Sequence, residues 1–271
     1  MVQPCPLDRT DPAPRRVGIL GGMGPEATVL LMQKIITATP AQDDADHIPL
    51  IVDQNTQVPS RIRYLIEKTG DDPGPVLAAM AQRLQTAGAE ALAMPCNTAH
   101  HYAPVIRAAV TVPLIDMVEL SVKHAATLVG AGGTLGILAS PAVRRMGLFE
   151  RALADLGIIP IYALDEDSLL ATIRQIKASG ATGQLRGAFA AASAALLARG
   201  AQVQMIACTE FSLMSDATAP GCVAFDALDQ LVSGIVAFAR TGGIGQSKAD
   251  PMPPSHSATA PHVHPNQETT P

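Results

Sequence analysis

The chain has 271 residues, 48% of them hydrophobic, which is enough to bury a sizeable core in one large domain or two modest lobes. A net charge of −5, the lack of any Lys/Arg block and only 3% aromatic residues exclude a nucleic-acid partner and point to a small polar ligand. No apolar run approaches the ~20 residues of a membrane-spanning helix, and the N-terminus lacks the basic start and apolar stretch of a secretory signal. We therefore expect a cytoplasmic protein without membrane contact.

Short apolar runs alternate with longer amphipathic stretches along the chain. The expected strands, in chain order, are residues 16–20, 48–54, 91–94, 112–115, 134–138, 158–162, 203–207 and 223–225. The expected helices between and after them are residues 25–38, 73–87, 102–109, 117–129, 142–156, 169–179, 183–199 and 228–240. This repeated order predicts an α/β fold of mainly parallel sheets flanked by helices, with ligands bound beyond the carboxyl ends of the strands.

Two cysteines lie in matching surroundings, which indicates two weakly similar halves. Gly88 precedes Cys96 by the same spacing, and across a similar apolar run, as Gly200 precedes Cys208. If the halves fold alike and face each other, a thiol from each points into the cleft between them. Two opposed thiols suit proton transfer to and from both faces of one carbon. No C-x-x-C spacing occurs, so we expect free thiols and no metal site.

A glycine-rich loop follows the first expected strand and precedes a helix. Gly22, Gly24 and Ala27 match the G-x-G-x-x-A dinucleotide pattern, but Asp53 lies too late in the chain to be its ribose-binding acid. A better interpretation is an anion site for a carboxylate, formed by helix N-terminal amides with Pro25 at the first helical position. A tight turn that needs glycine is the structural alternative.

Polar residues follow both cysteines at the ends of their strands. A following helix N-terminus would lower a thiol pKa from about 8.5. Asn97 and Thr98 offer hydrogen-bond donors for a carboxylate, and Glu210 offers a partner for a substrate ammonium. Arg61, after a Pro-containing turn, projects either over the cleft or into solvent. Lys177 lies near a helix end, where a cation is favourable on structural grounds alone.

Taken together, several motifs in this chain resemble the aspartate/glutamate racemase family, whose cofactor-independent members use paired cysteines. The resemblance rests on residues 21–28 (GGMGPEAT), 39–40 (TP), 46–49 (DHIP), 57–61 (QVPSR), 94–100 (MPCNTAH) and 207–210 (ACTE). Glu210 favours the aspartate racemase branch, because glutamate racemases are similar around the first cysteine but have Cys-Thr-His around the second. Two departures, Ser60 for Asp and residues 140–143 (SPAV) for a Thr-rich turn, touch the cleft rim.

The resemblance implies roles for the residues that match these motifs. Cys96 and Cys208 would be the acid/base pair, and no cofactor or metal would be needed. The α-carboxylate would be held by Asn97, Thr98 and Thr209, and the side-chain carboxylate by Arg61 and Lys177. The remaining expected substrate contacts are Met23, Gly24, Pro25, Ala99 and Glu210.

The resemblance also implies how the chain is organised. We expect a first α/β lobe of residues 15–116 plus 224–241, a second of residues 117–223, and a homodimer. Composition predicts disordered tails at residues 1–14 and 242–271. The expected activity is interconversion of L- and D-aspartate. The alternatives are a racemase for glutamate or a broader set of amino acids and, from other classes, an NAD-dependent dehydrogenase or a small-carboxylate binding protein.

Overall fold

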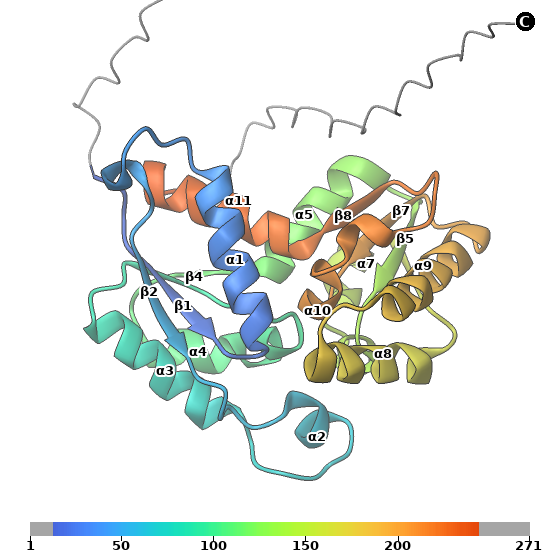
Figure 1. The fold of residues 1–271 in the computed structure, drawn as a ribbon, viewed down its shortest axis with the longest axis horizontal. Helices are drawn as coiled ribbons and strands as arrows, with labels where there is room; N and C mark the ends of the chain where they lie inside the picture. Colours follow the sequence, from blue (N-terminus) through green and yellow to red (C-terminus); the bar gives the residue numbers. More distant parts are fainter. Residues whose placement is uncertain (1–12, 244–271) are drawn as a thin grey trace, which may run out of the picture.

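Two four-stranded parallel sheets form the cores of two lobes in the computed structural model, which describes residues 13–243 (Figure 1). The first sheet has the order β2-β1-β3-β4, with β1 (Val17–Gly21), β2 (Leu50–Gln54), β3 (Ala91–Ala93) and β4 (Leu114–Ile115). The second has the order β6-β5-β7-β8, with β5 (Thr134–Leu138), β6 (Ile159–Tyr162), β7 (Val203–Ile206) and β8 (Ala224–Asp226). Each half thus places its first strand between its second and third, which confirms that the two lobes share one topology.

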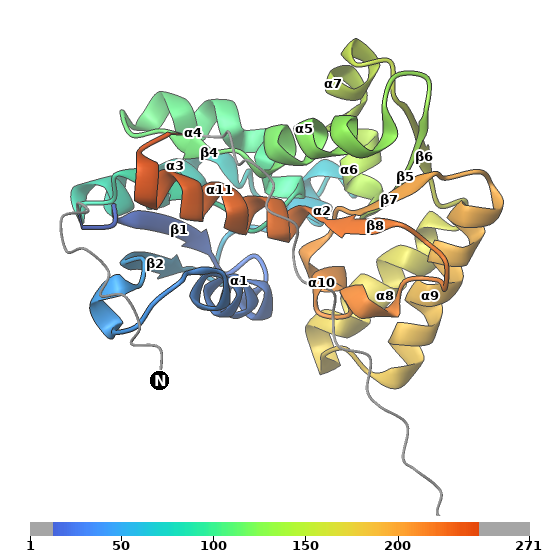
Figure 2. The ribbon, with the colours of Figure 1, turned by 90° about the horizontal axis from the view of Figure 1, so that it is seen from above.

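Helices cover both faces of each sheet (Figures 1 and 2). They are α1 (Pro25–Ala38), α2 (Arg61–Leu65), α3 (Gly74–Thr86), α4 (Ala103–Ala109), α5 (Met117–Val129), α6 (Pro141–Arg145), α7 (Glu150–Asp155), α8 (Glu166–Ser179), α9 (Gly183–Ala198), α10 (Thr209–Ser212) and α11 (Ala227–Thr241). Short 3-10 turns occupy Asp44–Asp46, Thr98–Tyr102 and Ser215–Ala217. None of the helices in this part of the chain is long and apolar enough to reach across a lipid bilayer.

Successive residues of the central strands belong to opposite cores, as expected for a parallel sheet covered on both faces. In β1, Leu20 packs in the core with α3 and α4, whereas Ile19 packs in the core with α1 and α11. In β5, Ile137 packs with α5 and α7, and Leu138 with α8 and α9. Each lobe is therefore a helix–sheet–helix sandwich.

The chain crosses between the lobes twice, along two adjacent helices (Figure 2). α5 begins directly after β4 of the first sheet, and Val122 on it packs in a core of the second lobe. α11 begins directly after β8 of the second sheet, and Leu231 on it packs against the first sheet. Each crossing helix starts at an aspartate that accepts backbone N–H bonds, Asp116 for α5 and Asp226 for α11.

Two expectations need correction. The segment 142–156 is not one helix, because Gly147 adopts φ 61° and the buried Phe149 separates α6 from α7. Residues 224–226 do not belong to the first lobe, because β8 pairs in parallel with β7, with Gln204 opposite Ala224. The predicted disordered segments fall mainly on residues 1–12 and 244–271, which lie outside the described part.

Candidate active site

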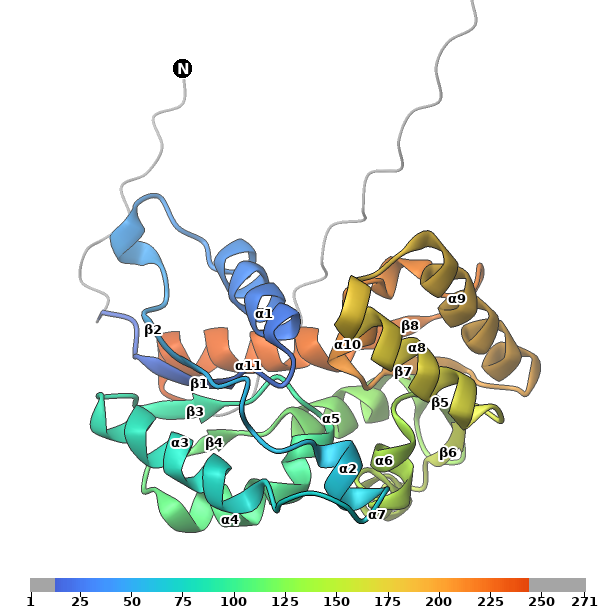
Figure 3. The same cartoon turned by 60° about the horizontal axis from the view of Figure 1, so that its bottom comes forward.

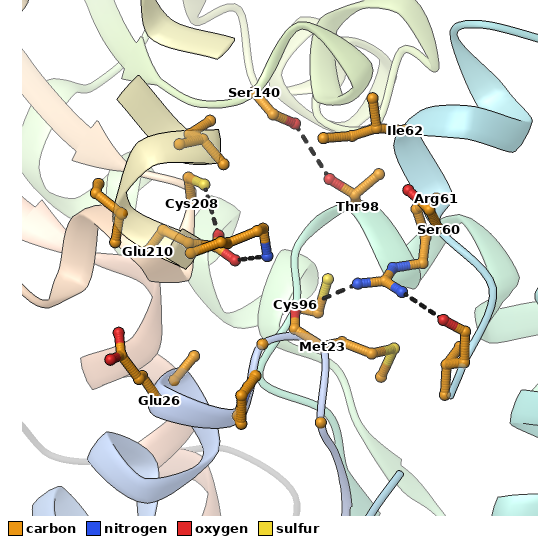
Figure 4. Close-up of a pocket in the computed structure, with 18 of the residues that line it drawn as sticks. Met23, Glu26, Ser60, Arg61, Ile62, Cys96, Thr98, Ser140, Cys208 and Glu210 are labelled. Atoms are coloured by element: carbon orange, nitrogen blue, oxygen red, sulfur yellow. Dashed lines mark hydrogen bonds and ion pairs between the residues drawn. The ribbon is translucent and has the colours of Figure 1, made fainter. Parts of the chain in front are cut away.

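A cavity of about 390 Å³ lies between the lobes, where loops after strands of both sheets meet (Figure 4). Both cysteines line this cavity, Cys96 after β3 of the first lobe and Cys208 after β7 of the second. They are 8% and 7% exposed and are free thiols. Four charged residues line the same cavity, namely Glu26, Arg61, Lys177 and Glu210.

The glycine-rich loop needs glycine for steric reasons and also lines the cavity. Gly22 has φ 89°, and a Cβ there would lie 2.4 Å from the backbone of Asn55. Gly24 caps α1, and a Cβ on it would lie 3.6 Å from Lys177 Nζ. The turn interpretation therefore holds for Gly22, and Gly24 lies beside the charged groups of the site. Asp53, which a dinucleotide site would use, is paired with Arg83 at 2.6 Å instead.

His100 holds the Cys96 loop from behind. Its Nδ1 donates to the carbonyl oxygen of Cys96 at 2.8 Å, and its Nε2 accepts from the amide of Met117 at 3.2 Å. These partners require the neutral Nδ1–H tautomer, and burial also lowers the His100 pKa. The sequence shows His100 within the cysteine motif, but spacing alone did not assign it this role.

Next to Cys96, Asn97 is 3% exposed, and neither polar atom of its side chain has a partner among the described residues. The neighbouring Thr98 lines the cavity, and its hydroxyl lies 3.2 Å from that of Ser140 in the second lobe. A hydrogen bond thus joins the two lobes across the site (Figure 4). Ser140 was recognised in the sequence only as a departure from the family pattern.

Cys208 has charged neighbours that set its protonation. Its Sγ donates to Glu210 Oε2 at 3.1 Å, and the other carboxylate oxygen accepts from Lys177 (Figure 4). Burial and the Glu210 carboxylate raise the pKa of Cys208 well above its usual value. This reverses the expectation of a lowered pKa for this thiol, because these effects outweigh Lys177 and the N-terminus of the short α10.

Lys177 keeps its charge in this setting. Burial disfavours the ammonium, but the Glu210 carboxylate, together with Cys208 and Cys96, more than offsets burial, and the Lys177 pKa is raised. Glu210 was expected to face a substrate ammonium, and Lys177 a substrate carboxylate. In the structure, the Lys177 ammonium and the Glu210 carboxylate both line the cavity and form an ion pair with each other.

Arg61 opens α2, a helix that the sequence analysis did not predict and that lies against α6 of the second lobe (Figure 3). Its guanidinium donates to the carbonyl oxygens of Val58, Pro59 and Met23, at 3.4, 3.0 and 3.5 Å. Its Nε is buried without a partner among the described residues. The side chain therefore lies at the cavity, with donor capacity left unused.

The structure brings most of the expected site residues to this cavity. Those that line it are Met23, Gly24, Pro25, Arg61, Cys96, Thr98, Lys177, Cys208 and Glu210. Asn97, Ala99 and Thr209 are buried beside the cysteines but do not line the cavity. The sequence analysis did not single out Glu26, Ile62, Ile173, Ile176 or Leu213, which also line it. Three of these lie on α8 or just after α10, so only packing brings them here.

Two α/β lobes of one topology, each supplying a thiol to a shared cavity, define the class of this protein. The family model for Asp/Glu/hydantoin racemases matches residues 20–239, and the chain belongs to that family. Its members are racemases, a group of isomerases.

Comparison with individual proteins agrees with this assignment. A curated relative, the broad-specificity amino-acid racemase RacX of Bacillus subtilis (strain 168), is 32% identical over 112 residues, covering 40% of this chain and 48% of RacX. The match thus spans about half of that relative. Aspartate racemase of Picrophilus torridus has the same fold, with a TM-score of 0.73 at 24% identity over 83% of this chain and 94% of that one. Glutamate racemase RacE1 of Bacillus anthracis gives 0.60 at 15% identity over 85% and 83%.

Proposed function

We propose that this protein is a cofactor-independent amino-acid racemase that interconverts L- and D-aspartate by a two-base mechanism. The observation that carries the proposal is the pair Cys96 and Cys208, one from each lobe, lining one cavity. One sulfur, as thiolate, removes the α-hydrogen, and the other, as thiol, delivers a proton to the opposite face. Each turnover exchanges the roles of the two sulfurs, so no proton is gained or lost overall.

The surroundings of the two thiols support a defined starting form. Cys208 donates a hydrogen bond to the Glu210 carboxylate, and its pKa is raised, which favours the thiol at this position. Cys96 then acts first as the base, and Cys208 first as the acid. The reverse reaction starts from Cys208 thiolate, where Lys177 stabilises the negative charge.

The carboxylates of aspartate have candidate partners on the first lobe. The Thr98 hydroxyl lines the cavity next to Cys96 and suits the α-carboxylate, whose charge grows as the α-proton leaves. The Asn97 amide, which has no partner among the described residues, is buried beside it. Arg61, with its unused Nε donor, suits the side-chain carboxylate. Lys177 contributes positive charge although it is paired with Glu210. An arginine and a lysine at one cavity favour a dicarboxylate over a neutral amino acid.

A wider substrate range is the second candidate within this reaction type. RacX is a broad-specificity amino-acid racemase, and the apolar side chains Val58, Ile62 and Leu213 line the same cavity as the charged ones. Glutamate is the nearest alternative, because it offers the same charges on a longer chain.

The decisive experiment is incubation of the purified protein with L-aspartate in deuterium oxide. We expect loss of the α-proton signal in the NMR spectrum and the appearance of D-aspartate by chiral chromatography. Activity should survive a chelator and hydroxylamine, and the double variant Cys96→Ala/Cys208→Ala should serve as the inactive control. Exchange that needs added metal or pyridoxal phosphate, or that persists at full rate without either cysteine, would contradict the proposal. Turnover of glutamate, but not aspartate, would favour the alternative substrate.

A further inference from the structure

The two halves place a polar side chain and an aspartate at equivalent positions beside their cysteine loops. In the first half, His100 follows Cys96 at the same spacing as Ser212 follows Cys208 in the second. Ser212 donates to Asp226 Oδ1 at 2.9 Å, whereas His100 Nε2 accepts from the Met117 amide at 3.2 Å and lies 3.9 Å from the corresponding Asp116 Oδ1 without a hydrogen bond. In both halves that aspartate also caps the helix that crosses back to the other lobe. We call His100 with Asp116 the first anchor, and Ser212 with Asp226 the second anchor.

The anchors differ in how well their carboxyl groups are satisfied. In the first anchor, Asp116 Oδ1 accepts from the amides of Val118 and Glu119, and Oδ2 accepts from Arg107 at 2.8 Å. In the second anchor, Asp226 Oδ1 accepts from Ser212 and from the amide of Leu228 at 2.8 Å. Asp226 Oδ2 is buried without a partner among the described residues, and the residue is 4% exposed.

Among the described residues, Lys34 is the neighbouring cation that lowers the Asp226 pKa, and its effect is smaller than those of burial and Asp229. Asp229, on the same helix, repels an ionised Asp226, and Lys34 from α1 is engaged by Asp229 at 2.6 Å. The ionisable side chain of α10 is Glu210, which is occupied by Cys208 and Lys177. Burial and Asp229 therefore raise the pKa of Asp226 to about 7.

We propose that Asp226 is a positioning residue for Cys208: its protonated carboxyl is buried where α10 packs on α11, and loss of the proton weakens this packing although the bond from Ser212 to the carboxylate persists. An ionised carboxylate in this place needs water or another donor at Oδ2, which requires α10 to separate from α11. α10 carries Glu210, so the contact between Glu210 and Cys208 changes with it. The first anchor has no such dependence, because both oxygens of Asp116 are already partnered.

The stability of the protein should report this proton. A carboxyl whose pKa is raised from 3.8 to about 7 by folding keeps its proton in the native state over that range while the unfolded chain loses it. The stability from the protonated form is therefore lost as the pH rises toward about 7, and the curve levels off above it. Asp226→Asn should remove this dependence of stability on pH. As the pH rises from 3.8 to about 7, the melting temperature of Asp226→Asn should therefore increase relative to that of the wild type.

The test combines titration with the pH profile of kcat/KM. In the wild type, the Asp226 carboxyl carbon should titrate near pH 7 by ¹³C NMR, and kcat/KM for aspartate should decline with a midpoint at the same pH. Asp226→Asn should remove this decline, so that kcat/KM falls only at higher pH, where both thiols ionise. Two further variants should move it in opposite directions: Ser212→Ala to higher pH by removing a donor, and Asp229→Asn to lower pH by removing a repelling charge.

Asp116→Asn, the matched change in the first anchor, should alter stability without moving the midpoint. An Asp226 carboxyl that titrates near its ordinary value, or an unchanged midpoint in Ser212→Ala and Asp229→Asn, would overturn the inference, even if Asp226→Asn failed to fold. The activity profiles rest on the proposed racemase function, whereas the NMR titration and the melting temperatures do not. A wild type whose Asp226 carboxyl titrates as expected but which does not racemise aspartate would contradict the proposed function and leave the inference about Asp226 intact.

Discussion

At the scale of single residues, the two thiols differ most in the charges around them. The Glu210 carboxylate accepts a hydrogen bond from the Cys208 thiol and forms an ion pair with the Lys177 ammonium. The carboxylate favours the thiol over the thiolate, while the cation limits this effect. The protonation of the Cys208 sulfur is thus set by burial and by the charged side chains around it.

Glu210→Gln should lower the pKa of Cys208, because it removes a negative charge 3.1 Å from the sulfur and keeps the side-chain shape. The pH dependence of thiolate absorbance gives this pKa when it is measured in a background in which Cys5, Cys96 and Cys222 are replaced by Ser. Glu26→Gln is the matched control, since Glu26 lines the same cavity but forms no ion pair with any described residue. Equal thiol titrations in Glu210→Gln and its parent would show that the contact has no electrostatic effect.

Arg61→Ala should weaken the use of aspartate far more than that of alanine, because only aspartate offers a second carboxylate. A hydrogen bond to a charged group is worth about 1.5–3 kcal/mol, or roughly tenfold to a hundredfold in kcat/KM. The control is Arg63→Ala, an exposed arginine on the same helix that does not line the cavity. If aspartate and alanine lost activity equally, Arg61 would have a structural role only.

At the scale of elements, the glycine-rich loop shows how packing decides a local conformation. Gly22 lies where the β1–α1 loop passes the backbone of Asn55, and the Gly22 amide donates to the Thr28 hydroxyl at 3.0 Å. The same hydroxyl donates to the carbonyl oxygen of Gly24 at 3.2 Å. This places the N-terminus of α1 against Lys177 and Glu210 of the other lobe.

Gly22→Ala should destabilise the protein more than Gly132→Ala does. Both glycines have positive φ, 89° and 80°, which costs an alanine about 1 kcal/mol. Only at position 22 would the new Cβ meet backbone, at 2.4 Å, whereas nothing lies within 4 Å at position 132. We expect Gly22→Ala to cost about 1–3 kcal/mol more in urea unfolding. Equal losses would mean that the loop moves aside at no cost.

At the scale of the whole molecule, the duplicated topology explains why one thiol comes from each lobe. β3 and β7 occupy the same place in their sheets, and a cysteine follows each strand. Their carboxyl ends face one cavity because the chain crosses between the lobes along the paired helices α5 and α11 (Figures 1 and 2). The two-base mechanism that we propose would therefore be a consequence of how two copies of one unit are joined.

Cys96→Ala and Cys208→Ala should each abolish racemisation while leaving a distinct partial reaction. Each remaining thiolate serves one face of the α-carbon, so each variant should exchange the α-proton of one enantiomer of aspartate with deuterium. Opposite enantiomer preferences, followed by NMR in deuterium oxide, are the expected result, and the double variant should show no exchange. Residual racemisation at equal rates in both single variants would mean that a single base suffices.

The sequence by itself was enough to predict the α/β class, most strands and helices, and the matching surroundings of Cys96 and Cys208. These depend on short-range signals: apolar periodicity, Pro25 at a helix start, and the repeated spacing between Gly and Cys. The motif residues 57–61 and 94–100 also contain four of the polar side chains that line the cavity, namely Ser60, Arg61, Cys96 and Thr98, because a loop after a parallel strand must emerge at the carboxyl end of the sheet.

Only the tertiary structure decided which of these groups face one another. Lys177 and Glu210 lie on different helices, and their contact depends on how α8 packs beside α10. The same holds for Asp226, whose unpartnered oxygen and raised pKa result from burial between α10 and α11. Strand and helix signals act over a few residues, whereas desolvation and charge pairing depend on neighbours far away in the chain, so the protonation of the site could not be read from the sequence.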